Sequence, residues 1–163
     1  MSRAPAQPID ELAWRRALVE RLAADLARIA AIAADAPEPP PGEWSARQVV
    51  LHLVAVEEQV WQARLSQLGA SAGPNGLQLS PPTWPWVEPG PWTGPGDDSL
   101  AGALDELGRR RAATLETVGA LDEAGWRRYG FHATFGRLDV ARLLTIAVDH
   151  DAEHLAQIAA LGG

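Results

Sequence analysis

Four stretches of the chain repeat apolar residues at spacings of three and four, and every proline lies outside them. They span about residues 10–35, 45–69, 98–121 and 139–161. This spacing puts the apolar side chains on one face of an α-helix, and proline interrupts helices. The pattern therefore predicts an all-α fold of four helices. A length of 163 residues fits one domain, which we expect to span residues 1–163.

Capping residues sharpen the predicted helix ends. Asp10 is a candidate N-cap of the first helix, and Ser45 with Gln48 fits a capping box at the start of the second. Asp139 begins the fourth helix. The apolar stripe predicted for the first helix consists of Ile9, Leu12, Val19, Leu22, Leu26, Ile29 and Ala33.

The connection between the second and third helices is long. Residues 70–97 carry seven of the 13 prolines and the cluster Trp84, Trp86 and Trp92. Fully extended, such a segment reaches on the order of 90 Å, whereas a 24-residue helix is about 36 Å long. A crossover that leaves the two helices parallel is therefore allowed. The three tryptophans either cap the bundle end or contact a substrate.

Composition excludes several kinds of chemistry. The chain has no Cys, which removes disulfides, thiolate metal sites and a cysteine nucleophile. All 14 cationic residues are Arg, and 21 acidic residues bring the net charge to −7, so we expect no nucleic-acid partner. The longest apolar runs hold about six residues, against about 20 for a membrane span. With no apolar signal-peptide core near the N-terminus, we expect a cytoplasmic protein that does not contact membranes.

Histidines on apolar stripes give the most specific functional signal. His150 and His154 lie one turn apart on the fourth helix, on the face that also holds Leu143, Ala147, Gln157 and Leu161, and His52 interrupts the stripe of the second. One alternative is that each is a core histidine with its own hydrogen-bond partner. Three buried imidazoles without a shared ligand would cost about 1–3 kcal/mol for each unmet nitrogen. We therefore expect one divalent metal ion on His52, His150 and His154.

Three neutral ligands are typical of an open site, where water or substrate completes the coordination shell. Zinc and nickel are the leading expectations, and manganese, iron or cobalt would also accept these ligands. Among nearby side chains, Asp149, Asp151 and Glu153 either orient an imidazole or lie solvated on the helix face. Gln157 is the better candidate for a pocket contact. A variant zincin motif at residues 150–154 ranks low, because Asp151 is shorter than the usual Glu base.

Three blocks of sequence resemble the DinB/YfiT-like family of metal-binding four-helix bundles, which is distinct from the DNA polymerase that shares the name. These blocks are residues 44–53, 126–138 and 150–158. The resemblance implies an up-down-down-up bundle that holds a divalent ion on His52, His150 and His154. It also implies hydrolysis, or transfer of a low-molecular-weight thiol to an electrophile, and a homodimer. His132 matches a histidine of the loop before the fourth helix, and we expect it to be a pocket or structural residue.

Two classes of function remain open. In the first, the chain is a metal-dependent enzyme acting on a small-molecule substrate, and Arg110 or Arg111 binds an anion, with Arg111 on the core stripe of the third helix. The alternative for Arg111 is a solvated surface cation. In the second, the chain is a non-catalytic stress-response or dimerisation module whose metal is structural or absent, and the seven Trp serve as core and interface. A DNA-repair role would contradict the acidic charge balance.

Overall fold

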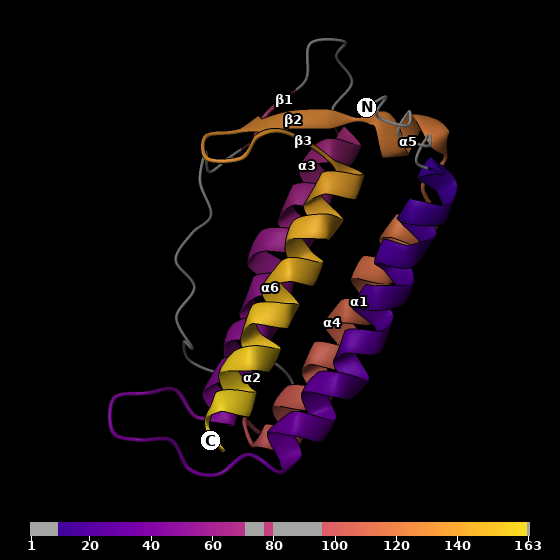
Figure 1. Cartoon of the computed structure of the whole chain (residues 1–163). Helices are drawn as coiled ribbons and strands as arrows, with labels where there is room; N and C mark the ends of the chain where they lie inside the picture. The colour runs from indigo at the N-terminus through magenta and orange to yellow at the C-terminus, as the bar shows by residue number, and fades with distance from the viewer. Residues whose placement is uncertain (1–9, 71–76, 80–95, 163) are drawn as a thin grey trace, which may run out of the picture.

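Four long helical segments lie side by side under a small sheet (Figure 1). The computed structural model describes residues 10–70, 77–79 and 96–162. The helical elements are α1 (Glu11–Ala34), α2 (Ala46–Val56), the π-helix η1 (Glu57–Gln62), α3 (Ala63–Ala70), α4 (Leu100–Gly119), α5 (Glu123–Arg127) and α6 (Val140–Ala160). The strands are β1 (Leu77–Gln78), β2 (Tyr129–His132) and β3 (Gly136–Asp139).

The helices have the up-down-down-up topology that the resemblance implies. In Figure 1, α1 and α6 run in one direction, whereas the α2–η1–α3 segment and α4 run in the other. Because α2 and α4 are parallel neighbours, α3 ends and α4 begins at opposite ends of the bundle. Trp84, Trp86 and Trp92, to which we assigned a capping or substrate role, lie outside the described residues.

Three of the predicted caps are present. The side chain of Asp10 accepts from the backbone N–H of Ala13, and the Ser45–Gln48 capping box is complete. The side chain of Asp139 accepts from the N–H of Arg142 at the start of α6. These bonds satisfy N–H groups that the first helical turn leaves free, so local sequence is enough to set the starts of α1, α2 and α6.

The second helix departs from the prediction of one continuous α-helix. It is α-helical to Val56, π-helical over Glu57–Gln62, and α-helical again from Ala63. A π-helix changes which side chains face inward, and here Glu57, Val60 and Trp61 are all buried. The spacing of apolar residues alone did not reveal this change, since Val56 and Val60 also fit an ordinary α-helix.

A three-stranded sheet forms from two segments that we predicted to be loops, one after the second helix and one before the fourth. Strand β2 pairs in parallel with β1 and antiparallel with β3. Gly136, with φ +68°, adopts the left-handed conformation where β3 begins. Leu138 of β3 and Leu79, which follows β1, are buried in the apolar core, so the sheet closes one end of the helical core. The prediction for these segments was wrong because the strands are only two to four residues long.

The predicted apolar stripe of α1 is also partly wrong. Leu12 is 67% exposed, and Arg15 is buried in its place. The guanidinium of Arg15 lies 5.0 Å from the ring centroid of Trp126 and donates to Glu123, so α5 supplies its neighbours. Ile9 lies outside the described residues. Glu11 of α1 also accepts from this guanidinium, so the burial of Arg15 depends on partners from both α1 and α5.

The core consists of two apolar clusters. One lies near the sheet and includes Leu22, Val60 and Leu144, and the other lies near the opposite end and includes Ile29, Leu107 and Ile158. Between them, α1, η1, α4 and α6 each contribute buried polar side chains. We call this set the polar layer, and it comprises Asp25, Glu57, Arg111, Thr114 and Asp151.

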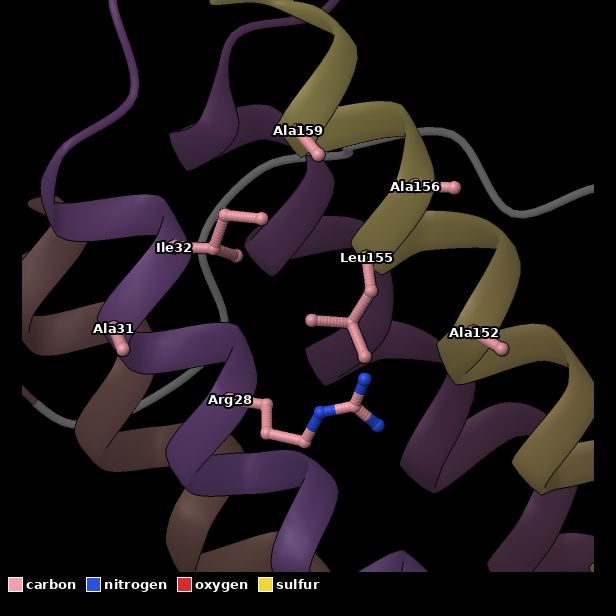
Figure 2. Close-up of a pocket in the computed structure, with 7 residues that line it drawn as sticks. All are labelled: Arg28, Ala31, Ile32, Ala152, Leu155, Ala156 and Ala159. Carbon is pink, nitrogen blue, oxygen red and sulfur yellow. The ribbon is translucent and has the colours of Figure 1, made fainter.

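An apolar groove of about 680 Å³ runs between α1 and α6 (Figure 2). Its lining from α6 includes Ala152, Ala156 and Ala159. Residues two positions apart in a helix point in nearly opposite directions, so this groove lies on the side of α6 that faces away from His154. It is separate from the histidine cluster described below. Across the described ranges, no helix is both long enough and apolar enough to cross a bilayer.

Candidate metal centre

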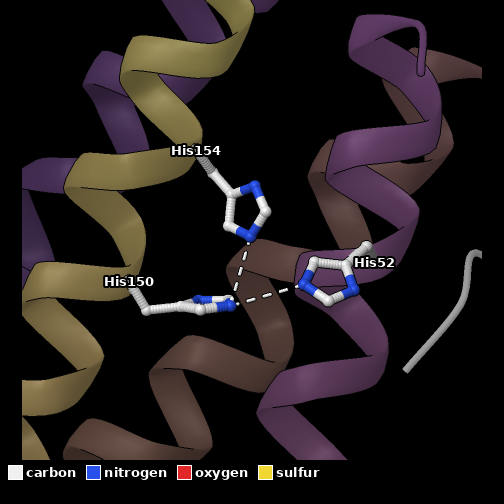
Figure 3. Close-up of side chains that lie close together, drawn as sticks. All are labelled: His52, His150 and His154. Atoms are coloured by element: carbon white, nitrogen blue, oxygen red, sulfur yellow. Dashed lines mark hydrogen bonds between the residues drawn. The ribbon is translucent and has the colours of Figure 1, made fainter. Parts of the chain in front are cut away.

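Three imidazole rings meet between α2 and α6. His52 comes from α2, and His150 and His154 come from successive turns of α6 (Figure 3). The Nε2 atom of His150 lies 3.4 Å from Nε2 of His52 and 3.2 Å from Nε2 of His154. Among the described residues, these three are the group whose ligand atoms lie close enough together to hold one metal ion.

The nitrogen separations fit a shared ion. A tetrahedral site with metal–nitrogen bonds of about 2.05 Å requires nitrogens about 3.3 Å apart. Two of the three separations, 3.2 and 3.4 Å, lie on either side of this requirement, and all three ligand atoms lie within 4.8 Å of one another. Each imidazole can direct an Nε2 lone pair toward the point between the rings. The residues therefore fit a divalent cation with three nitrogen ligands.

The Nδ1 atoms behave differently in the two histidines of α6. Nδ1 of His154 lies 2.8 Å from Oε1 of Gln157. An amide oxygen only accepts, so Nδ1 carries the proton and Nε2 keeps its lone pair for a metal. Nδ1 of His150 is buried without a hydrogen-bond partner among the described residues. Gln157 therefore orients His154, whereas packing orients His150.

Burial, together with the neighbouring His154, His52 and Arg111, lowers the pKa of His150 to about 3. A histidine with this pKa is neutral at pH 7, as metal ligation requires. Two tryptophans flank the cluster: the ring centroid of Trp44 lies 5.3 Å from that of His52, and Trp61 meets His150 edge-on at 5.7 Å. The site thus combines imidazole nitrogens with neighbouring aromatic rings.

Asp151 and Arg111 belong to the polar layer. Asp151 is fully buried and accepts from Nη1 and Nη2 of Arg111 at 2.8 and 3.2 Å. Nε of Arg111 donates to Glu57, and Nη1 also donates to the carbonyl of Leu22 at 2.9 Å. The solvated alternatives for both residues are wrong. Arg111 was expected to bind an external anion, and the structure gives it two carboxylates of the chain instead.

Glu57 is a buried residue that the sequence reasoning missed. Its second carboxylate oxygen accepts from Thr114 at 2.7 Å. Burial raises its pKa, while the charge of Arg111 acts in the opposite direction. An acidic residue between Val56 and Val60 on an apolar stripe was the available signal. Its partners come from α4, which lies about 50 positions later in the sequence.

The remaining candidates lie outside the cluster. His132 is in β2, where its Nδ1 accepts from the backbone N–H of Thr134 and of Phe135 at 3.1 and 3.3 Å. Burial lowers its pKa, and the charge of Arg64 adds to the effect. Asp149 and Glu153 are exposed. Gln157 is exposed too, so the prediction that it lies on the core-facing stripe is wrong. From this exposed position its side chain still reaches His154.

Comparison with known proteins yields a structural and a family match. No curated protein matches the chain. Among solved structures, the chain matches YfiT from Bacillus subtilis, which is described as a probable metal-dependent hydrolase with an unusual four-helix bundle topology. The match has a TM-score of 0.65 at 17% identity and covers 98% of this chain and 91% of that one. At this identity the likeness establishes the fold. The family model of the DinB superfamily matches residues 16–158, and the chain therefore belongs to the DinB superfamily.

Proposed function

We propose that this protein is a metal-dependent enzyme that binds a divalent ion through His52, His150 and His154 and acts on a small-molecule electrophile. The observation that carries the proposal is the convergence of three Nε2 atoms at separations of 3.2 and 3.4 Å between nearest neighbours. The description of YfiT as a probable metal-dependent hydrolase supports the same class of activity. Zinc or nickel is the expected ion, because both accept imidazole ligands.

The ligand set defines what the ion contributes. All three protein ligands are neutral, so a bound divalent ion keeps its full charge and acts as a Lewis acid toward a nucleophile or substrate oxygen. His154 is held by Gln157, and Trp44 and Trp61 border the rings with apolar surface. These side chains orient the ligands and restrict access of water on the sides that they cover.

Two nucleophiles are compatible with the proposed site. Water would make the reaction a hydrolysis, and an external low-molecular-weight thiol would make it a thiol transfer. The chain has no cysteine, so any thiol in the reaction must enter as a cosubstrate. In thiol transfer, the thiol sulfur forms a bond to the electrophilic carbon while the leaving group departs with its electron pair, and the thiol proton passes to solvent.

The decisive experiment combines metal analysis with activity measurements. We expect about one divalent ion per chain in protein purified without a metal-affinity step. A panel of esters, amides and alkylating electrophiles, with and without thiols, should then be turned over, and chelation should abolish the turnover.

The double variant His150→Ala/His154→Ala should lose both the ion and the activity, whereas His132→Asn should keep both. Metal-free protein that retains full activity would contradict the proposal. Turnover absent from the whole panel, with partner binding unchanged in the double variant, would favour a non-catalytic binding module.

A further inference from the structure

The ligating histidines lie on two helices that contact each other sparsely. α6 packs along α1, and α2 packs along α4, whereas α2 and α6 meet at few positions. His52 is on α2, and its two partners are on α6. The distance from His52 to the His150–His154 pair therefore depends on contacts that connect the helices indirectly.

The polar layer supplies such a connection at the level of the histidines. Arg111 projects from α4 and binds Glu57 of η1 and Asp151 of α6 with the same guanidinium. Glu57 follows α2 directly, and Asp151 follows His150. Arg111, Glu57 and Asp151 are each no more than 1% exposed. We call these three residues the buried triad.

The chemistry of arginine suits this bridging role. Its planar guanidinium presents donors in fixed directions, and it stays charged when buried. Two of these donors bind Asp151 at 2.8 and 3.2 Å, which fixes the orientation of that carboxylate as well as its distance. Thr114 donates to the other oxygen of Glu57, so side chains of α4 bind the carboxylates of both Glu57 and Asp151. A shift of α6 relative to α2 would break these bonds.

We infer that the buried triad is a positioning device that sets the gap between His52 and the His150–His154 pair, and thereby the coordination geometry of the ion. This inference rests on the proposed metal site. His150 and His154 share one helix, so their mutual spacing does not need the triad. Weakening the triad should therefore release His52 selectively and leave a two-histidine site on α6.

A rival explanation is that the triad acts through its charge. Two carboxylates and one guanidinium carry a formal charge of −1, which would attract a cation whichever histidines bind it. The two explanations differ in a double-mutant cycle. Positioning makes the effect of Asp151→Asn depend on His52, whereas charge attraction makes it equal with and without His52.

The test is a titration of Co²⁺ into four chelator-treated proteins: wild type, His52→Ala, Asp151→Asn and the double variant. Co²⁺ reports its coordination through visible absorption, so affinity and geometry are read together. We expect Asp151→Asn to weaken binding by about 10–100-fold and to shift the spectrum toward that of His52→Ala. In the His52→Ala background, the same substitution should change the affinity less than about twofold.

Each contrary result has a distinct meaning. If His52→Ala leaves Co²⁺ affinity and spectrum unchanged, the proposed three-histidine site is wrong. If His52→Ala weakens binding but Asp151→Asn has no effect, or an equal effect in both backgrounds, the site stands and the positioning role is wrong.

Two further variants separate positioning from loss of folding. Glu57→Gln disturbs the opposite end of the bridge while keeping an amide that can accept from Arg111, and it should reproduce the spectral shift. Glu106→Gln is the matched control, because Glu106 is a buried carboxylate of α4 that pairs with Arg109 and Arg110 of the same helix. This control should keep the wild-type spectrum. Circular dichroism of each metal-free variant verifies that the comparison is made on folded protein.

Discussion

Replacing Gln157 by alanine is expected to weaken metal binding without weakening the fold. Gln157 lies on the exposed face of α6, and its Oε1 lies 2.8 Å from Nδ1 of His154. This bond holds the proton on Nδ1 and leaves Nε2, the nitrogen that faces His150, unprotonated. Without it, His154 is free to rotate about χ2 and to adopt the other tautomer, so a smaller fraction of the chains presents the ligating nitrogen.

The magnitude follows from two independent estimates. A hydrogen bond of this kind contributes about 0.5–1.5 kcal/mol net, which corresponds to about 2–13-fold in affinity. Removal of an outer partner of a ligating histidine typically weakens metal binding by about 10–100-fold. The two ranges overlap near tenfold, which is the expected loss. The free energy of unfolding of the metal-free protein should change by less than about 0.5 kcal/mol, because the residue is exposed.

Isothermal titration of Zn²⁺ or Ni²⁺ into the metal-free proteins measures the affinity, and urea unfolding in the presence of chelator measures the stability. Glu153→Ala is the matched control, since Glu153 is also exposed on α6, directly precedes His154 and makes no hydrogen bond to it. Equal affinities for Gln157→Ala and wild type, or an equal loss in both variants, would refute the orienting role of Gln157.

Three other predictions concern the fold. Ile29 is fully buried in the second apolar cluster, and Ile29→Ala should lower the free energy of unfolding by about 2–5 kcal/mol in urea titrations. Ile32→Ala, at a half-buried position, should lower this free energy clearly less, and an equal decrease in both variants would argue against that cluster. Ser45→Ala removes a capping-box acceptor and should lower the free energy of unfolding by about 1 kcal/mol. Ser66→Ala, at an exposed position of α3, should leave this free energy almost unchanged, and a decrease for Ser45→Ala no larger than for Ser66→Ala would contradict the role of the cap. Burial lowers the pKa of His132, so only the unfolded chain takes up this proton as the pH falls below 6.5. The contribution of His132 to the free energy of unfolding is therefore complete above pH 6.5 and is lost progressively as the pH falls below 6.5. With chelator present, His132→Asn should make stability fall less steeply than in wild type between pH 7 and 5, and identical slopes would exclude this contribution.

Helix boundaries were predictable wherever local chemistry determines them. The caps at Asp10, Ser45 and Asp139 act within three residues of sequence, and the structure confirms all three. The sheet was not predictable in the same way, because β1 and β2 lie about 50 residues apart and are short. The π-helix also escaped prediction. Within it, Glu57 accepts from Thr114 and Arg111 of α4, and these long-range contacts are invisible to local periodicity.

The histidine site shows the same division. The sequence by itself determined that His150 and His154 share a helix face, since a spacing of four places side chains one turn apart. It also placed His52 on a core-facing stripe. The placement of His52 beside the other two was decided only in three dimensions, where α4 and the buried triad connect helices that barely touch. The burial of Arg111 and Asp151 likewise required the folded chain. A buried charge is tolerated only when a partner of opposite charge is brought to it, and the carboxylates that pair with Arg111 lie tens of residues away from it in the sequence.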